Sequence, residues 1–122
     1  MFRFLVCLLG VLSVNWIGTA QELSRQQRDL FEIHVRPLLV TKCLNCHGPA
    51  KQEGGLSLAT REDVLTGGES GPAIVSGEPE QSLLLEALRY ESLEMPPDGQ
   101  VKASQIAGIS QWIAAGAPWP AK

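Results

Sequence analysis

Two cysteines and a histidine form the densest group of reactive side chains in this chain of 122 residues. Cys43 and Cys46 are three residues apart, and His47 follows directly, in the pentapeptide CLNCH. Residues at this spacing on a helical turn project to the same side, so both thiols can add to the vinyl groups of one porphyrin. The imidazole of His47 can then turn toward the iron. This pattern is typical of covalent haem attachment.

Two other kinds of site use cysteines at this spacing. A dithiol redox site needs a βαβ setting, and the sequence predicts almost no strand. A structural zinc site needs four ligands in a tetrahedron. Only His34 remains as a further soft ligand, and the adjacent Cys46 and His47 do not readily face one small ion. Haem attachment therefore explains the pattern better than a dithiol site, a zinc site or a chance occurrence in a loop.

Met95 is the leading candidate for the second axial ligand of such a haem. It is the only methionine after the first twenty residues, and Pro96 and Pro97 follow it. A residue before proline is driven into extended backbone, so this loop is stiff enough to hold a thioether sulfur opposite His47. Ligation by His and Met raises the reduction potential relative to two nitrogen ligands. The alternatives are that Met95 fills a gap in the core, or that His34 is the ligand.

The first twenty residues are organised like a secretory signal peptide. A short positive start, MFR, precedes the apolar run FLVCLLGVLSV, and small residues lead to Ala20. We expect cleavage after Ala20, so that residues 1–20 are the signal and residues 21–122 are an exported mono-haem domain. The apolar run is short for a membrane span. Trp16 and Ile17 lengthen the apolar region and keep an uncleaved anchor as the alternative.

Cysteine usage agrees with export, and the net charge bears on the kind of partner. Cys7 lies inside the apolar run and is interpreted as a small apolar residue, which leaves Cys43 and Cys46 in the domain. An oxidising compartment would join two free thiols, yet a disulfide across so short a loop restrains the unfolded chain little. The formal charge is -3 and no basic stripe is present, which argues against nucleic acid as the main partner.

Apolar residues at helical spacing predict a small all-α domain of four or five helices with long loops. The expected helices cover residues 21–39, 58–65, 79–90 and about 102–115. Pro37 is expected to end or bend the first of them, because proline cannot donate the backbone hydrogen bond. Residues 67–79 are rich in Gly, Ser and Pro and predict an extended loop, with a short strand possible at residues 73–75. This loop either lines the haem edge or is a flexible surface connection.

The early helix, CLNCH, a late methionine beside prolines and a closing helix together resemble a class I cytochrome c. Residues 34–120 resemble the planctomycete-type cytochrome c domain more closely, in the stretches HVRPLLVTKCLNCHG, GGLSLATREDVLTGGESGPAIVSGEPEQSLL, EMPPDG and QWIAAGAPWP. The resemblance implies a small class I cytochrome c-like fold around one haem. It also implies covalent haem c on Cys43 and Cys46, with His47 and Met95 as axial ligands.

The resemblance further implies that the first and last helices cross, and Phe31 and Trp112 are the candidate residues for this contact. The sequence departs from the family at residues 102–104 (KAS), where a Ser-Asp-Glu type cap is usual, and this weakens the start of the last helix. Such domains often head much longer proteins, whereas this sequence stops after Lys122. The sequence is compatible with a stand-alone carrier and with a truncated module.

The sequence thus predicts an exported c-type cytochrome that carries one electron and has no enzymatic role, since no general acid, base or nucleophile is evident. We expect a redox partner protein, and contact with a membrane only through the signal peptide. The alternative is a haem-containing sensor or docking module for a larger exported enzyme. Lys42, Lys51 and Lys102 are a candidate patch for an acidic partner, but a scattered solvated surface is the favoured interpretation.

Overall fold

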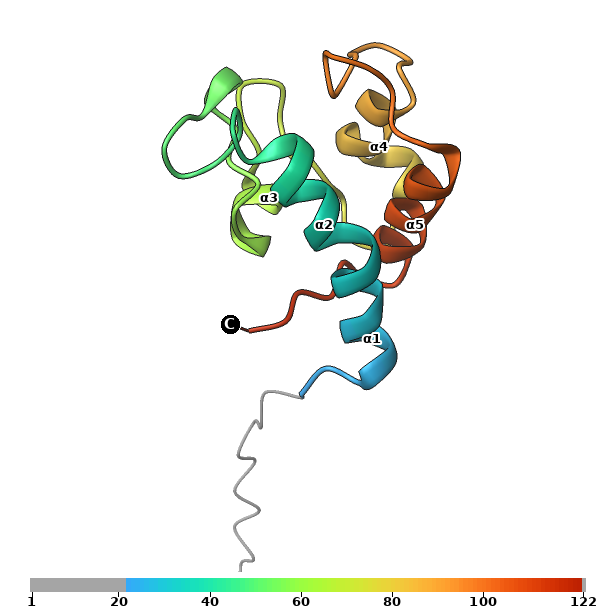
Figure 1. Cartoon of the computed structure of the whole chain (residues 1–122). Coiled ribbons are helices and arrows are strands. Elements are labelled where there is room, and N and C mark those ends of the chain that lie inside the picture. Colours follow the sequence, from blue (N-terminus) through green and yellow to red (C-terminus); the bar gives the residue numbers. More distant parts are fainter. Residues whose placement is uncertain (1–21, 122) are drawn as a thin grey trace, which may run out of the picture.

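The computed structural model describes residues 22–121, and this part of the chain is helical and contains no β-sheet (Figure 1). The expected all-α class is therefore confirmed. The signal peptide predicted for residues 1–20 lies outside the described residues. Among the described helices, none has the length and apolar character needed to cross a bilayer.

One unbroken run of helical backbone leads from the start of the described domain to the first cysteine. Ser24 begins it with a capping box: its hydroxyl accepts the N–H of Gln27 at 3.2 Å, and the Gln27 side chain accepts the N–H of Ser24 at 2.8 Å. The run consists of α1 (Arg25–Leu30), η1 (Phe31–Val35), α2 (Arg36–Leu38) and η2 (Leu39–Cys43), of which η1 and η2 are π-helical.

The first helix extends beyond the expected end at residue 39, because the helical path passes Pro37 and continues to Cys43. Proline has no N–H and its ring collides with the carbonyl four residues earlier, so an ordinary α-helical ladder cannot pass through it. The wider π turns on either side accommodate it. The N–H of Arg36 donates to the carbonyl of Phe31, and the Thr41 hydroxyl donates to the carbonyl of Pro37 at 2.7 Å. Cys43 is consequently positioned by a helix.

Shorter elements follow the cysteines. They are η3 (Glu53–Gly55), α3 (Arg61–Thr66), η4 (Pro79–Gln81), α4 (Leu83–Leu88) and α5 (Ala103–Ala114). The helix expected at residues 58–65 begins later, because the Thr60 side chain caps it by accepting the N–H of Asp63 at 3.1 Å. It ends where expected, at Gly67, whose φ of 73° suits glycine.

Ser82 divides the helix expected at residues 79–90 into η4 and α4. Its backbone is extended, with φ -95° and ψ 118°. Its buried hydroxyl donates to the carbonyl of Glu78 at 2.8 Å and accepts the N–H of Val75 at 3.0 Å. Ser82 therefore holds the preceding loop, and residues 73–75 form no strand.

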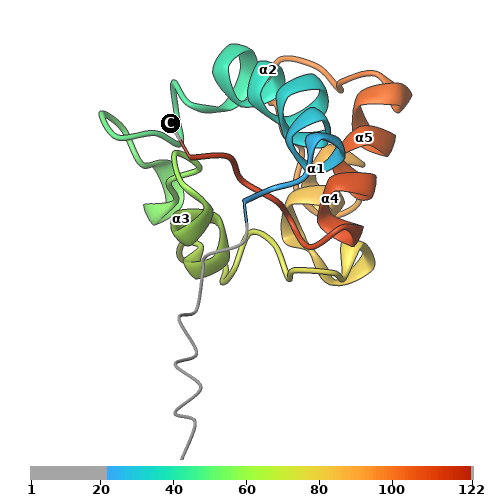
Figure 2. The ribbon, with the colours of Figure 1, turned by 90° about the horizontal axis from the view of Figure 1, so that it is seen from below.

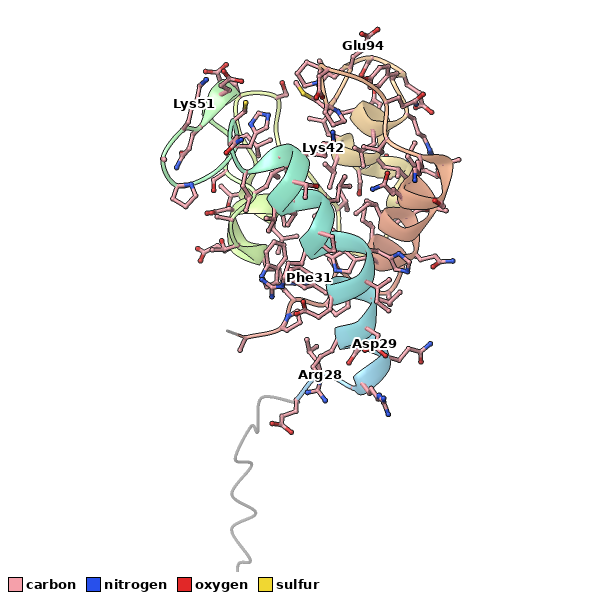
Figure 3. All side chains as sticks on the ribbon, in the orientation of Figure 1. Arg28, Asp29, Phe31, Lys42, Lys51 and Glu94 are labelled. Carbon is pink, nitrogen blue, oxygen red and sulfur yellow. The ribbon has the colours of Figure 1, made fainter. Side chains whose placement is uncertain are left out.

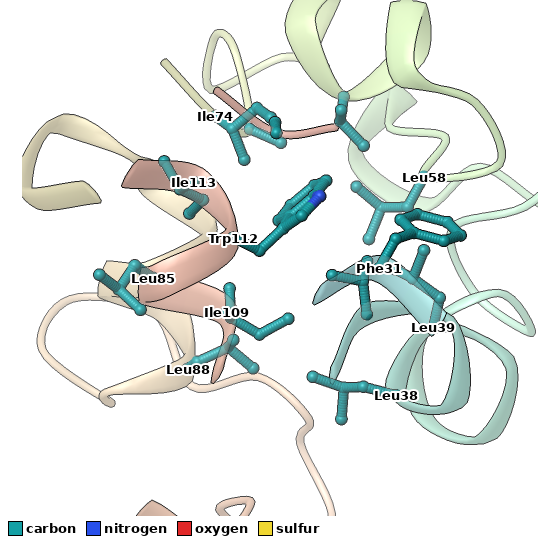
Figure 4. Close-up of a cluster of buried hydrophobic side chains, with 14 residues drawn as sticks. Phe31, Leu38, Leu39, Leu58, Ile74, Leu85, Leu88, Ile109, Trp112 and Ile113 are labelled. Atoms are coloured by element: carbon teal, nitrogen blue, oxygen red, sulfur yellow. The ribbon is translucent and has the colours of Figure 1, made fainter. Parts of the chain in front are cut away.

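The core lies where the first helix packs against α5 (Figure 4). The expected aromatic contact is present, with the ring centroids of Phe31 and Trp112 6.3 Å apart. Trp119 adds a third ring, 4.6 Å from that of Phe31. Trp112 is fully buried, and its indole N–H donates to the carbonyl of Pro118 at 2.8 Å. Aliphatic side chains complete the core, among them Leu38, Leu39, Leu85, Leu88, Ile109 and Ile113.

The segment after α5 closes the side of the core opposite the cysteines. Figure 2 shows this segment running from α5 toward α3. The Arg61 guanidinium of α3 donates to the carbonyls of Gly116 and Ala117, each at 3.1 Å. These hydrogen bonds attach the segment after α5 to α3. The ends of η2 and α4 lie at a cleft.

Candidate functional site

An apolar cleft lies between two parts of the chain that are far apart in sequence. Cys43, Cys46 and His47 line one side of it, and Met95 and the two prolines after it line the other. The rest of the lining is mainly apolar and includes Leu56, Leu58, Leu83, Leu84, Ala87, Leu88 and Leu93. In Figure 3, Lys51 and Glu94 lie on opposite sides of the top of the molecule, with Lys42 between them. All four residues predicted to bind haem thus share one cleft.

The backbone of the pentapeptide is tied on both sides. The N–H groups of Cys46 and His47 donate to the carbonyl of Cys43, at 3.2 and 2.9 Å. In turn, the carbonyl of Cys46 accepts the N–H of Glu53 and that of His47 accepts the N–H of Leu58, each at 2.8 Å. The cysteine turn is therefore fixed between the end of the helix and residues 53–58.

The two thiols of the described residues are free and partly buried. Burial raises the pKa of the Cys43 thiol to about 11, so this sulfur is a neutral thiol at physiological pH. A dithiol redox site needs a lowered thiol pKa. The environment of Cys43 has the opposite effect, which argues against a dithiol redox site.

His47 carries a second unusual feature. Its ring nitrogen Nδ1 is buried and has no hydrogen-bond partner among the described residues. An unpartnered buried nitrogen costs free energy, and a neutral imidazole always carries one unprotonated nitrogen that can bind a metal. The ring therefore has unused bonding capacity at the cleft.

A zinc site receives no support from residues 22–121. No group of three or more His, Cys, Asp or Glu side chains in this range converges on a point where an ion would lie. His34 in particular is not part of the cleft lining. Its ring lies against α5, where a Cβ added to Gly108 would be 2.6 Å from the Cγ of His34. Of the two candidates for the second axial ligand, the structure brings only Met95 to the cleft.

The loop that carries Met95 is folded back onto α4. The N–H of Met95 donates to the carbonyl of Ala87 at 3.2 Å. The Tyr90 hydroxyl donates to the carbonyl of Pro96, and the Gln100 side chain donates to the carbonyl of Leu88 at 3.1 Å. The peptide bond between Met95 and Pro96 is cis. Sequence reasoning did not find Tyr90 or Gln100, because a single polar residue near a loop gives no pattern that marks its partner.

The glycine-rich loop forms part of the cleft wall through Gly68, Glu69, Ser70, Gly71 and Ala73. Its backbone is packed closely: a Cβ on Gly67 would lie 1.9 Å from the carbonyl oxygen of Gly71. The N–H of Leu84 in α4 donates to the carbonyl of Ala73 at 2.8 Å. Of the two interpretations given to this loop, the structure supports a lining role over a loose surface connection.

Two of the lysines near the cleft lie close to carboxylates. Lys51 pairs with Glu53 at 2.9 Å, and this ion pair lowers the pKa of the Glu53 carboxyl. Lys42 lies 4.0 Å from Asp98. These pairs agree with a scattered charged surface.

The chemistry of the cleft fits a covalently attached haem. Apolar walls, two free thiols at a helix end, an imidazole with an unpartnered nitrogen and a thioether on the facing side are the groups that such a cofactor requires. A comparison with protein families agrees, since the family model described as Planctomycete cytochrome C matches residues 43–99. That range begins at Cys43, the first residue of the CLNCH pentapeptide, and includes Met95. No curated protein and no solved structure matches the chain.

Proposed function

We propose that this chain, whose residues 43–99 match the planctomycete cytochrome c family model, is an exported mono-haem cytochrome that carries single electrons. One observation carries the proposal: the cysteine turn and Met95, about half the chain apart in sequence, line one apolar cleft. A cleft that joins a haem attachment pattern to a thioether supplies residues that would hold a haem and bind its iron through both an imidazole and a sulfur.

Each group at the cleft has a distinct role in this proposal. Cys43 and Cys46 would hold the porphyrin through thioether bonds, and His47 and Met95 would be the iron ligands. Haem c supplies reversible one-electron transfer when it is bound. The leucines of the cleft keep water from the porphyrin faces, and burial together with the thioether ligand raises the reduction potential.

The proposal includes no enzymatic step. The acidic and basic side chains that line the cleft are Lys42, Glu53 and Glu69, each outside the buried core. The Glu53 carboxyl, with its lowered pKa, is a carboxylate at neutral pH and has no proton to donate as a general acid. The partner in this proposal is a redox protein that exchanges electrons with the exposed edge of the haem.

Export is part of the same proposal and rests on the signal peptide predicted for residues 1–20. Covalent haem attachment takes place outside the cytoplasm, so an exported chain and the CLNCH turn belong together. A mature protein that begins at Gln21 is the expected product, and its mass measures the cleavage directly.

A second candidate function is a ligand sensor or a haem-containing module of a larger enzyme. The observation that favours it is the position of Met95, whose side chain is 36% exposed at the rim of the cleft. A weakly held thioether would leave the iron open to a small ligand. Carbon monoxide separates the two functions, because it binds ferrous iron readily only where Met95 is absent from the sixth position.

The proposal is tested by producing the full chain with a haem-attachment system. We expect a mass increase of one haem, lost in the variant with Cys43→Ala and Cys46→Ala together, and a sharp ferrous spectrum. Met95→Ala should abolish the near-infrared sulfur-to-iron charge-transfer band of the ferric protein, while His34→Ala should keep it. A spectrum of two imidazoles that depends on His34 would contradict the ligation, and a haem that accepts no electron at physiological potentials would contradict the function.

A further inference from the structure

Tyr90 occupies a backbone position that normally belongs to glycine. Helix α4 ends in a Schellman motif: the N–H of Tyr90 donates to the carbonyl of Ala87 at 3.1 Å, and the N–H of Glu91 donates to that of Glu86 at 3.2 Å. The residue in the left-handed conformation of this motif is Tyr90, with φ 58°. A side chain with a Cβ is disfavoured there, and glycine would adopt the conformation without penalty.

The side chain of Tyr90 makes a contact that glycine could not make. Its hydroxyl donates to the carbonyl of Pro96. Pro96 is buried, whereas its neighbours Met95 and Pro97 are exposed. The phenol therefore reaches across the loop and holds the one residue of this stretch that packs into the protein. A strained residue persists where its surroundings offset the cost, and here the offset is this contact.

The hydrogen bond from Tyr90 restrains the backbone next to Met95. The N–H of Met95 donates to the carbonyl of Ala87 at 3.2 Å, on one side of the Met95–Pro96 peptide. Tyr90 holds the carbonyl on the other side of Pro96. The backbone that carries the Met95 side chain is thus attached to the end of α4 at two consecutive residues.

We propose that Tyr90 is a positioning residue that keeps the Met95 sulfur at the cleft and so controls the sixth position of the iron. This inference rests on the proposed ligation by Met95. In the absence of the phenol hydroxyl, the loop retains its backbone contacts but moves away from α4 more often. The result is a larger fraction of molecules in which Met95 is detached and an external ligand can enter.

The matched pair of variants is Tyr90→Phe and Ser92→Ala in the haem-loaded full chain. The first removes the hydroxyl that reaches Pro96, and the second removes a hydroxyl of the same loop that instead donates to the exposed Glu86 carboxylate. Loss of one hydrogen bond should raise the detached fraction about fivefold. We expect carbon monoxide to bind ferrous Tyr90→Phe about fivefold faster, with a weaker ferric charge-transfer band, and Ser92→Ala to behave like the parent protein.

A second measurement, on the same haem-loaded full chain, observes the hydrogen bond of Tyr90 itself and not the binding of an external ligand. Tyr90 is the only tyrosine of the sequence, so its Raman bands report directly whether the hydroxyl donates a hydrogen bond. Amide exchange at Met95 should be about fivefold faster in Tyr90→Phe. Tyr90→Gly suits the left-handed backbone yet lacks the phenol, so it should resemble Tyr90→Phe. Altered carbon monoxide binding in Tyr90→Gly alone would overturn the inference, because backbone shape would then be the cause.

The remaining outcomes separate this inference from the proposed function. A parent protein without the sulfur band overturns ligation by Met95, and the inference with it. A parent protein with the band, together with a Tyr90→Phe variant that binds carbon monoxide at the parent rate, overturns the inference alone. Faster amide exchange without faster carbon monoxide binding leaves Tyr90 a purely structural residue and also overturns it.

Discussion

The imidazole of His34 lies directly against the backbone of Gly108, where the first helix crosses α5. A Cβ at Gly108 would be 2.5 Å from Nδ1 and 2.9 Å from the Cβ of His34. The second of these atoms is fixed to the helix backbone and cannot rotate away. The close approach of the two helices therefore depends on the absence of a side chain at this position, and it also keeps His34 on the side of α5.

Gly108→Ala should consequently destabilise the protein. Alanine favours the helix by up to about 1 kcal/mol, but overpacking at a fixed contact costs about 1–3 kcal/mol, so we expect a net loss of about 1–2 kcal/mol in urea unfolding. The double variant with His34→Ala should recover part of the loss, since the ring clash is gone. Equal losses in the single and double variants would show that His34 does not limit the helix approach.

Trp112 should be the most sensitive aromatic residue of the core. Trp112→Phe removes the indole N–H that donates to the buried carbonyl of Pro118 at 2.8 Å and leaves that acceptor unpaired. The lost hydrogen bond and the lost volume together should lower the free energy of unfolding by about 2–3 kcal/mol. Trp119→Phe, at a partly exposed ring, should cost less. A larger loss at Trp119 would contradict the central place of Trp112.

The sequence singled out four residues that line the cleft, but not the way in which they are held. CLNCH and Met95 are visible because their chemistry is local: thiols three apart and a thioether beside two prolines. The helical class followed from the spacing of apolar residues. The aromatic contact between Phe31 and Trp112 followed from the family resemblance, and the structure contains it.

The elements that were predicted incorrectly depend on long-range or backbone effects. The first helix passes Pro37 through π turns, which leave no mark in the residue pattern. Ser82 is extended because its hydroxyl bonds to Val75 and Glu78, and such contacts outweigh local helix propensity. The hydrogen bond from Tyr90 to Pro96 joins residues six positions apart, and this spacing matches no helix or strand repeat that a sequence pattern would reveal.

The ion pair of Glu80 and Arg89 should give a small pH dependence of stability. The Arg89 guanidinium donates to the Glu80 carboxylate at 2.8 and 3.1 Å, and this bond lowers the pKa of Glu80 from its usual 4.5. A lowered carboxyl pKa stabilises the folded state above the usual value. The contribution is therefore lost as the pH falls below 4.5 and through the lowered pKa.

The contribution of this ion pair to stability is tested by measuring the urea concentration at the midpoint of unfolding across this acidic pH range. Glu80→Gln should flatten the dependence, and Glu78→Gln, which removes a nearby acid outside the pair, should leave it in place. The Glu80 side chain is largely exposed and that of Arg89 is partly exposed, so added salt should reduce the difference between the variants. An unchanged slope in Glu80→Gln would assign the acid sensitivity to another group.

Gly48, directly after the CLNCH pentapeptide, should be required for haem loading under the proposed function. It is buried, and a Cβ there would lie 2.3 Å from the carbonyl oxygen of Leu44, a backbone atom within the pentapeptide itself. Gly48→Ala must therefore shift the turn that presents Cys46 and His47. We expect a several-fold lower ratio of haem to protein at equal expression, measured by pyridine haemochrome absorbance. Ala50→Ser changes an exposed residue of the same loop and should load normally. Full loading of Gly48→Ala would show that the turn tolerates this displacement and that the close contact is not needed for attachment.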